Sequence, residues 1–243
     1  MPSGSKEGKI PKIIYQSYRD SNLPLSYRDN SLLLQKLNPG YRYEFFDDQR
    51  CREFLLEVFG PVHAKAFDDL VPGAFKCDLW RYAMLYTTGG IYLDLDIAPL
   101  VSLSEVITSE LTFISACDRR IFHFPKCALY QAFLGCEPGH PAVKLALDMS
   151  LQNVINRKPN TKETVLDITG PVVMGRAMNQ WLGRPEEAEL FPGESIRGKQ
   201  KIKLLRFDDD GRWVSSSSGR KIFSTVTNFS PPDYYTRTRT YRE

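Results

Sequence analysis

The chain has 243 residues, 42% of them hydrophobic and 12% aromatic, which is enough to bury a substantial core. The net charge of +3 is too small to predict nucleic-acid binding, and no RNA- or DNA-binding motif accompanies it. No apolar run reaches the length of a membrane span, and the N-terminal MPSGSKEGK lacks the apolar core of a signal peptide. The five cysteines form no CxxC pair, which favours reduced thiols and a cytoplasmic protein, with a domain trimmed from a secretory-pathway protein as the alternative.

The N-terminal part of the chain alternates predicted strands and helices. The expected order is a strand at 10–15, a helix that includes 31–37, a strand at 41–46 and a helix at 49–59. Asp47 or Asp48 is expected to cap the second helix, because carboxylates accept hydrogen bonds from free backbone N–H groups. This alternation is typical of an α/β protein with a mostly parallel central sheet flanked by helices.

A further helix is expected at 75–86, where apolar residues recur at spacings of three and four. Asp78 and Arg81 lie off this apolar stripe. Residues three apart are neighbours on a helix surface, so the two side chains can act as one polar pair, although such a pair is usually a weak surface contact. The glycine pair at 89–90 is expected to end the helix, because glycine readily adopts the left-handed conformation.

A strand is expected at 91–97, because apolar residues alternate there with Tyr92, Asp94 and Asp96. The two carboxylates then share a face, with Cα atoms roughly 7 Å apart. Ligands of α/β sheets bind beyond the carboxyl ends of strands. Two carboxylates with no Cys or His nearby favour Mg²⁺ or Mn²⁺, which leave coordination positions for phosphate oxygens.

Four segments in order resemble the DXD-containing sugar transferases of glycosyltransferase family 32, the group of the yeast outer-chain mannosyltransferases. A remoter similarity links them to the clostridial glucosylating toxins. The segments are IPKIIYQSY, DLWRYAMLYTTGGIYLDLD, GCEPGHP and TGP, and together they span most of residues 10 to 180. The resemblance implies a GT-A fold, a nucleotide-sugar donor, a divalent metal and retention of configuration at the transferred sugar.

The resemblance also implies roles for individual residues. Tyr15 takes the place of an aromatic ring that stacks on the donor base, with an ordinary core tyrosine as the alternative. Tyr92 is expected to touch the donor sugar or, alternatively, to pack in the sheet. Gln131 stands where the family usually has an asparagine that contacts the donor sugar, and Gly170 lies in the TGP turn near the reaction centre.

The resemblance also implies a third metal ligand near the C-terminus. The family often uses a histidine near the C-terminus, but this chain has no histidine beyond His140. Asn228, followed by Phe229 and Ser230, is the best candidate, because an amide carbonyl is also an oxygen ligand for a hard cation.

The rest of the chain is expected to complete a single GT-A domain over 1–243. In this interpretation 1–100 binds the nucleotide-sugar and metal, and 101–243 forms the acceptor side. A strand is expected at 113–116, a helix at 141–155 and a small C-terminal hairpin from 201–207 and 212–214, followed by a frayed basic tail.

Together, the acidic motif and the resemblance imply a metal-dependent retaining hexosyltransferase. Asp94, Asp96 and Asn228 hold the metal, Asp78 and Arg81 grip the sugar of a UDP- or GDP-linked donor, and a glycan or other hydroxyl compound is the acceptor. Asp78, Arg81 and Asp96 are the residues expected to be essential for catalysis. Two alternatives stay open: a phosphatase of the haloacid dehalogenase type, with Asp94 as nucleophile, and an inactive module that binds nucleotide-sugars.

Overall fold

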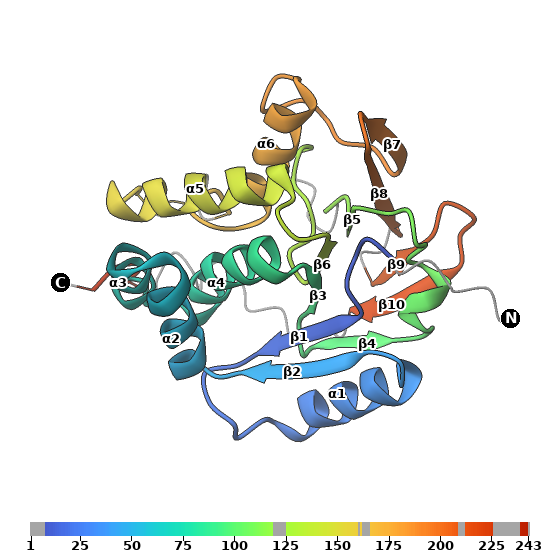
Figure 1. The fold of residues 1–243 in the computed structure, drawn as a ribbon, viewed down its shortest axis with the longest axis horizontal. Coiled ribbons are helices and arrows are strands. Elements are labelled where there is room, and N and C mark those ends of the chain that lie inside the picture. Colours follow the sequence, from blue (N-terminus) through green and yellow to red (C-terminus); the bar gives the residue numbers. More distant parts are fainter. Residues whose placement is uncertain are drawn as a thin grey trace, which may run out of the picture.

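The computed structural model describes residues 8–118, 125–159, 161, 166–208, 212–225 and 239–242. This part of the chain forms an α/β structure built on a long mixed sheet (Figure 1). Its helices are α1 (Leu25–Leu37), α2 (Asp48–Phe59), α3 (Pro61–Asp69), α4 (Gly73–Thr88), α5 (Pro141–Ile155), α6 (Pro171–Leu182) and the short 3-10 helix η1 (Leu103–Glu105). Among the described residues, no helix is both long and apolar enough to cross a membrane.

The strands follow the order β2-β1-β3-β6-β5-β8-β9-β10-β4, with β7 paired to β8. They are β1 (Ile13–Ser17), β2 (Arg42–Phe46), β3 (Gly90–Leu93), β4 (Ile97–Pro99), β5 (Phe113–Ala116), β6 (Phe133–Cys136), β7 (Gly193–Arg197), β8 (Gln200–Phe207), β9 (Trp213–Ser215) and β10 (Lys221–Thr225).

The sheet is mixed, which corrects the expectation of a mostly parallel one. Strand β1 runs parallel to β2 and β3, and β5 runs parallel to β8. The other described pairs, including β3 with β6 and β4 with β10, are antiparallel. The physical reason is that α-helices separate only some consecutive strands, namely β1 from β2, β2 from β3 and β6 from β7. Strands β7 to β10 follow one another without an intervening helix, and such connections favour antiparallel pairing.

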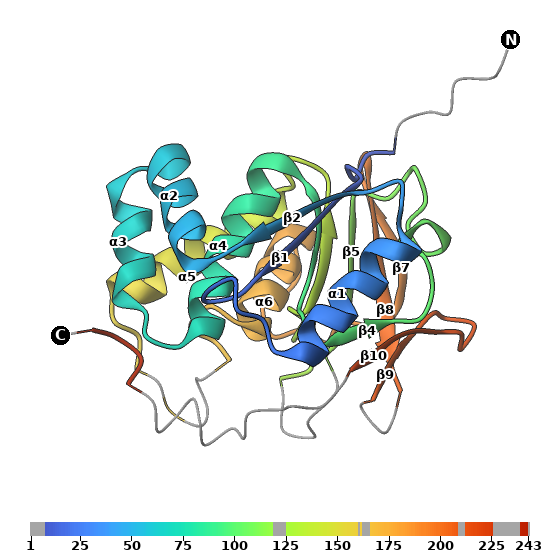
Figure 2. The same ribbon diagram turned by 90° about the horizontal axis from the view of Figure 1, so that it is seen from below.

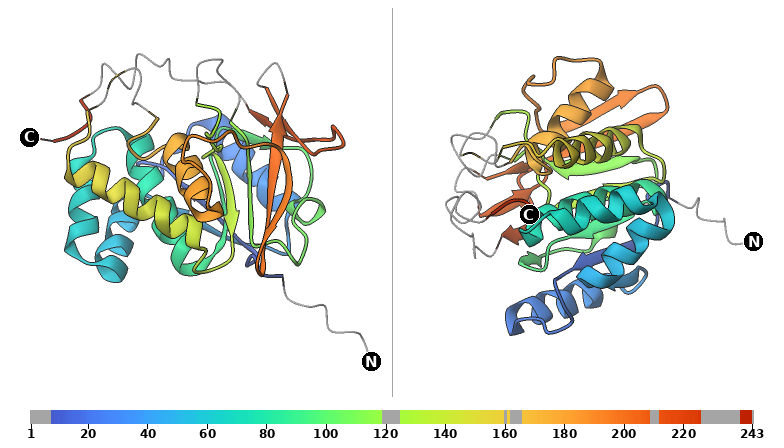
Figure 3. Two further views of the ribbon diagram at one scale, coloured as in Figure 1. Left: turned by 90° about the horizontal axis from the view of Figure 1, so that it is seen from above. Right: turned by 90° about the vertical axis from the view of Figure 1, so that its left-hand side faces the viewer.

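The two faces of the sheet belong to different hydrophobic cores. Tyr15 and Tyr92 pack in a core with residues of α2 to α6, whereas Ile14, Ile91 and Leu93 pack in a second core that includes α1. Figure 2 shows α1 on the opposite side of the sheet from α2 to α6, and Figure 3 shows α5 alongside α4 and α6. The alternation of side chains in the sequence therefore separates the two cores, as expected for strands buried on both faces.

The expectation of one strand over 91–97 is wrong. Strand β3 ends at Leu93 and β4 begins at Ile97, so residues 94–96 form a turn, which we call the acidic turn. The Ile97 N–H donates to the Asp94 carbonyl at 3.3 Å. The apolar alternation continues through the turn because Leu95 is buried there, 4% exposed, without belonging to a strand.

Most other predicted elements are confirmed. The helix that carries Asp78 and Arg81 is α4, and it ends before Gly89, whose φ is 64°. The predictions at 113–116 and 141–155 match β5 and α5, and Asp47 caps α2 by accepting from the Arg50 N–H. The predicted C-terminal hairpin is the antiparallel pair β8 and β9. The first strand, β1, starts and ends later than expected, at Ile13–Ser17.

Residues 240–242, within the described part of the chain, are docked rather than frayed. The Val71 N–H donates to the Thr240 carbonyl at 2.9 Å, and the Arg242 N–H donates to the Asp69 carbonyl at 2.7 Å. These bonds form because residues 240–242 run antiparallel to the segment between α3 and α4, with a bridge between Leu70 and Tyr241.

Candidate active site

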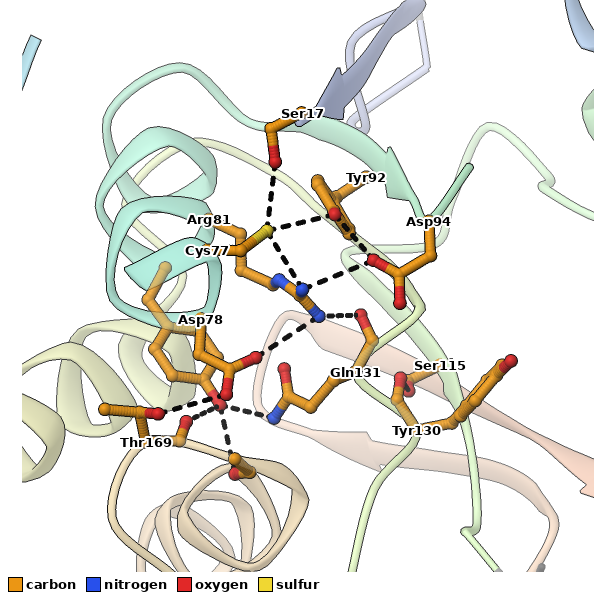
Figure 4. Close-up of polar contacts among 12 residues, drawn as sticks. Ser17, Cys77, Asp78, Arg81, Tyr92, Asp94, Ser115, Tyr130, Gln131 and Thr169 are labelled. Atoms are coloured by element: carbon orange, nitrogen blue, oxygen red, sulfur yellow. Dashed lines mark hydrogen bonds and ion pairs between the residues drawn. The ribbon is translucent and has the colours of Figure 1, made fainter. Parts of the chain in front are cut away.

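The candidate site lies where β3 ends beside helix α4 (Figure 4). Helix α4 places Cys77, Asp78 and Arg81 over the sheet face that carries Tyr92. Asp78 is 6% exposed and Arg81 3% exposed, so this acid and base are a buried pair and not a surface contact. Buried charges of this kind require partners, because an unpaired charge in a low dielectric is costly.

Arg81 is itself the charged partner of two acids, Asp78 and Asp94. Its Nη1 lies 3.4 Å from Asp78 Oδ1, and its Nη2 lies 3.3 Å from Asp94 Oδ1. The guanidinium stacks 4.1 Å from the ring centre of Tyr92, and Nη1 also donates to the Gln131 main-chain oxygen at 2.5 Å. A planar guanidinium with several donors can hold both carboxylates at once. Arg81 therefore joins the acid on α4 to the acidic turn.

Asp78 faces away from the turn toward the start of α6. Its Oδ2 accepts a hydrogen bond from Thr169 Oγ1 at 3.0 Å. Burial raises the pKa of the Asp78 carboxyl to about 7, although Arg81 and the Thr169 hydroxyl both favour the charged form. Gly170 follows Thr169 and precedes α6, so the TGP segment lies against Asp78 as one wall of the site.

Gln131 forms the neighbouring wall. The Tyr82 hydroxyl donates to the Thr169 main-chain oxygen at 2.9 Å, and Gln131 Nε2 donates to the Tyr82 oxygen. The other amide atom, Gln131 Oε1, is buried and has no hydrogen-bond partner within the described part of the chain. A buried acceptor without a partner is unusual in a folded protein.

Tyr92 is buried under Asp94. Its side chain is 1% exposed, and its hydroxyl donates to Asp94 Oδ1 at 2.6 Å. The same hydroxyl lies 3.0 Å from Cys77 Sγ, which in turn lies 3.0 Å from Ser17 Oγ. Burial raises the pKa of the Cys77 thiol, so the sulfur keeps its proton. In this structure Tyr92 packs in the sheet and holds a carboxylate.

The acidic turn is fixed through its main chain. Asn30 Nδ2 donates to the Leu95 oxygen at 3.0 Å, and Gln16 Nε2 donates to the Asp94 oxygen at 3.4 Å. The Asp94 side chain is 34% exposed, and Asp96 is also partly exposed. The turn therefore presents two carboxylates at the surface on a constrained backbone.

The residues of the acidic turn fit a metal that is shared with a ligand. No three His, Cys, Asp or Glu side chains in the described ranges lie close enough to hold a cation by themselves. Mg²⁺ and Mn²⁺ are commonly bound by one or two carboxylates together with substrate phosphates and water, which matches Asp94 and Asp96. The predicted ligand Asn228 lies outside the described residues.

The position of Tyr15 does not fit the predicted stacking on a donor base. It is 2% exposed, its ring packs on Phe46 with centroids 6.2 Å apart, and its hydroxyl bonds to Thr88 at 3.0 Å. The ring is therefore part of the core, with no open face. The physical reason is the strand alternation, which points Tyr15 toward α4.

Two tyrosines that the sequence analysis did not select lie closer to the acidic turn. Tyr18 directly follows β1, and its ring meets that of Tyr27 on α1 edge to face, with centroids 5.8 Å apart. Both rings are partly exposed. Burial, followed by the charge of Asp96, raises the pKa of Tyr27, which shows that the pair lies near the turn. The position of Tyr18 at the end of a strand was the available signal.

The fold is the GT-A fold of glycosyltransferases. The solved structure of the PaToxG glycosyltransferase superposes with a TM-score of 0.57 at 19% identity, covering 72% of this chain and 70% of that chain. Residues 27–113 match the family described as the glycosyltransferase sugar-binding region containing DXD motif. Over these residues the chain is similar to the DXD-containing glycosyltransferases, and relatives with glycosyltransferase names support this assignment.

Relatives of the chain occur in a virus and in yeasts. An uncharacterized glycosyltransferase, L373, of Acanthamoeba polyphaga mimivirus is 29% identical over 163 residues, which cover 66% of this chain and 61% of that protein. Inositol phosphoceramide mannosyltransferase 3 of Schizosaccharomyces pombe is 24% identical over 192 residues, which cover 75% of this chain and 48% of that protein. The initiation-specific alpha-1,6-mannosyltransferase of Candida albicans is 27% identical over 116 residues, 45% of this chain and 30% of that protein. The chain thus matches at most about three fifths of the length of these relatives.

Proposed function

We propose that this protein is a metal-dependent, retaining glycosyltransferase that moves a hexose from a UDP- or GDP-linked donor to the hydroxyl of a glycan or another acceptor. The observation that carries the proposal is Arg81, which joins Asp78 on α4 to Asp94 in the acidic turn. This contact sets a buried polar wall directly beside the two partly exposed carboxylates of Asp94 and Asp96. A donor with a sugar on one side and a diphosphate on the other matches that pairing.

In this proposal the diphosphate of the donor binds at the acidic turn. Asp94 and Asp96 would hold Mn²⁺ or Mg²⁺, with Asn228 as a predicted further ligand. When bound, the cation neutralises the negative charge that develops on the departing diphosphate. The protein's own contribution is the constrained turn, because Asn30 and Gln16 hold its main-chain oxygens.

In this proposal the sugar of the donor binds against the wall formed by Asp78, Gln131 and Gly170. Asp78 accepts hydrogen bonds, Arg81 donates them, and the buried Gln131 Oε1 offers an acceptor that has no partner among the described residues. Sugar hydroxyls both donate and accept, so these groups can fix the orientation of a hexose.

The base of the donor is assigned to the Tyr18 and Tyr27 pair instead of Tyr15. These rings are partly exposed and lie near the acidic turn, and flat aromatic rings stack readily on bases. A tryptophan in place of Tyr18 should keep donor affinity, whereas alanine should lower it.

Transfer proceeds by attack of the acceptor hydroxyl from the side of the leaving group. The departing phosphate takes the proton of that hydroxyl, and the bond from the sugar to the phosphate oxygen breaks. Asp78 and Arg81 hold the sugar in place while the phosphate leaves. No side chain of the described site is assigned as a nucleophile, because each described carboxylate already has a holding role.

Mannose is the first hexose to test. Several relatives are named mannosyltransferases, among them an inositol phosphoceramide mannosyltransferase and an initiation-specific alpha-1,6-mannosyltransferase. The chain matches only part of each of these proteins, so its own sugar and acceptor are matters for experiment. The cytoplasmic location likewise stays a prediction.

The two alternatives make different predictions. A phosphatase would require Asp94 to attack phosphate, but Asp94 Oδ1 is held by both Tyr92 and Arg81, and the family assignment favours sugar transfer. Beryllofluoride should therefore not trap an aspartyl phosphate. An inactive binding module would bind the donor tightly without turning it over, even with acceptors supplied.

A donor screen tests the proposal. GDP-mannose, UDP-glucose and related donors are assayed for hydrolysis and transfer with Mn²⁺, Mg²⁺ or chelator. We expect metal-dependent turnover of one donor, its loss in Asp96→Ala, and its retention in Glu57→Ala, which removes an exposed acid on α2. Near-native activity of Asp96→Ala would defeat the assignment of the metal site.

A further inference from the structure

A chain of four side chains leads from the end of β1 to the acidic turn. Ser17 Oγ lies 3.0 Å from Cys77 Sγ, Cys77 Sγ lies 3.0 Å from the Tyr92 oxygen, and the Tyr92 oxygen lies 2.6 Å from Asp94 Oδ1 (Figure 4). The members come from three separate elements, β1, α4 and β3, and from the acidic turn. This hydrogen-bond chain therefore ties Asp94, the first carboxylate of the turn, to strands β1 and β3 and to helix α4.

The protons of this chain can point in one direction only. An ionised carboxylate accepts but does not donate, so the single hydroxyl proton of Tyr92 lies on the bond to Asp94. The Tyr92 oxygen is then the acceptor for the Cys77 S–H. The sulfur in turn accepts from the Ser17 hydroxyl and from Arg81 Nη2, which lies 3.1 Å away. Each donor is thus oriented by the group behind it, and such chains strengthen their members by polarisation.

We propose that Cys77 is a positioning residue which, with Ser17 behind it, directs the Tyr92 hydroxyl onto Asp94 and so holds that carboxylate in place for a divalent cation. The cation part of this inference rests on the proposed function, whereas the orientation of Asp94 does not. Removing a group that holds a metal ligand in this way typically lowers metal affinity by about 10- to 100-fold.

A hydrogen-bonding role makes a different prediction from a packing role. Serine is smaller than cysteine but keeps one donor and one acceptor, whereas valine fills the space of the thiol and has neither. If Cys77 acts by hydrogen bonding, Cys77→Ser retains the function and Cys77→Val loses it. If Cys77 only packs, valine is the better replacement.

The test compares wild type, Cys77→Ser and Cys77→Val by crystal structure and by titration with Mn²⁺ alone, followed by electron paramagnetic resonance. We expect Cys77→Val to weaken Mn²⁺ binding about tenfold or more, and Cys77→Ser to stay within about threefold of wild type. The crystal structure of Cys77→Val should show the Asp94 carboxylate turned away from Tyr92. Cys136→Val is the matched control, because Cys136 is a fully buried thiol on β6 that lies outside the hydrogen-bond chain from Ser17 to Asp94.

A second comparison separates this chain from general destabilisation. In a Tyr92→Phe background, which removes the hydroxyl, Cys77→Val should have no further effect on Mn²⁺ affinity. The proposal is overturned if Cys77→Val leaves Asp94 and the affinity unchanged, if Cys77→Ser is as weak as Cys77→Val, or if the two substitutions act additively. Should wild type and Asp94→Ala bind Mn²⁺ equally, the metal assignment fails, and the crystal structures alone decide the positioning role.

Discussion

Arg81 is the residue on which the electrostatics of the site depend. It balances Asp78 in the interior and Asp94 at the turn, and its own side chain is only 4% exposed. Removing one partner of a buried ion pair leaves the other charge without compensation. The cost of losing Arg81 should therefore exceed that of losing an arginine at the surface.

At pH 8, where Asp78 is mostly ionised, Arg81→Ala should lower the free energy of unfolding by about 3 to 5 kcal/mol, because Asp78 loses its buried partner. Urea unfolding without added metal measures the change. The control is Arg52→Ala, whose pair with Asp68 has the shorter distance of 2.8 Å but is 44% and 35% exposed. That variant should lose about 1 kcal/mol or less, and equal losses in the two variants would contradict the burial argument.

The raised pKa of Asp78, about 7, predicts an unusual dependence of stability on pH. The folded protein keeps a proton that the unfolded chain releases above about pH 4. Stability attributable to Asp78 is therefore fully present below about pH 4 and falls as the pH rises from about 4 to about 7, since the unfolded state binds fewer protons there.

In Asp78→Asn the side-chain amide does not titrate, so the stability of this variant does not fall in the same pH range. Its stability relative to wild type should therefore rise by about 2 kcal/mol between pH 5 and pH 8 in the absence of metal. Thermal or urea unfolding at both pH values measures the difference. Glu57→Gln, at an exposed position, should show a constant difference. A constant difference for Asp78→Asn as well would show that the carboxyl is ionised throughout.

The sequence placed Asp78 and Arg81 on one helix and Asp94 just beyond the next strand, which was enough to expect them near one another. It did not indicate that Arg81 bridges the two acids, because that depends on how α4 packs on the sheet. The pairing of Tyr18 with Tyr27 was equally hidden, since it requires α1 to lie beside the end of β1. Local patterns predict elements, whereas contacts between distant elements follow from packing.

At the scale of elements, the acidic turn is where the sequence pattern and the structure diverge. Alternation over 91–97 suggests one strand, but β3 pairs with β1 and β6, while β4 pairs with β10 at the end of the sheet. The change of partners forces the chain to bend at residues 94–96. Side-chain alternation carries no information about which strand supplies the hydrogen bonds, so the bend could not be predicted.

Asn30 on α1 should be needed to keep this turn in place. Asn30→Ala removes the donor to the Leu95 oxygen, and we expect a loss of about 1 kcal/mol in stability, together with weaker Mn²⁺ binding. Thermal unfolding and Mn²⁺ titration measure the two effects. Asp29→Ala, an exposed neighbour on α1, should leave both nearly unchanged. Unaltered Mn²⁺ affinity in Asn30→Ala would show that the turn keeps its shape without α1.

At the scale of the whole molecule, residues 1–100 and residues 101–243 both contribute strands to one sheet. Strand β3 pairs with β6, and β4 pairs with β10, so strands from residues 1–100 depend on partners from residues 101–243. The acidic turn lies between these two pairings. Its position is therefore set by contacts far apart in sequence, which are the contacts that sequence patterns predict least well.

The docked C-terminus adds one more long-range contact. Tyr241 packs its ring against the main core, and its hydroxyl donates to the Lys158 oxygen at 2.9 Å, at the end of α5. Arg242 next to it contributes through its main chain, by an N–H bond to Asp69 and by accepting from Arg157. The side chain of Tyr241 should therefore matter for stability, and that of Arg242 should not.

Tyr241→Ala should lower the free energy of unfolding by about 2 kcal/mol, because it exposes part of the core and leaves the Lys158 oxygen without this donor. For a chain of this size that loss corresponds to a fall in Tm of roughly 4 to 8 °C. Arg242→Ala keeps both main-chain bonds and should change Tm by less than about 2 °C. Differential scanning calorimetry of the two variants decides the point. If both variants melt like wild type, the last residues do not hold the corner between α3 and α4, and the docking seen at Thr240 and Arg242 contributes nothing to stability.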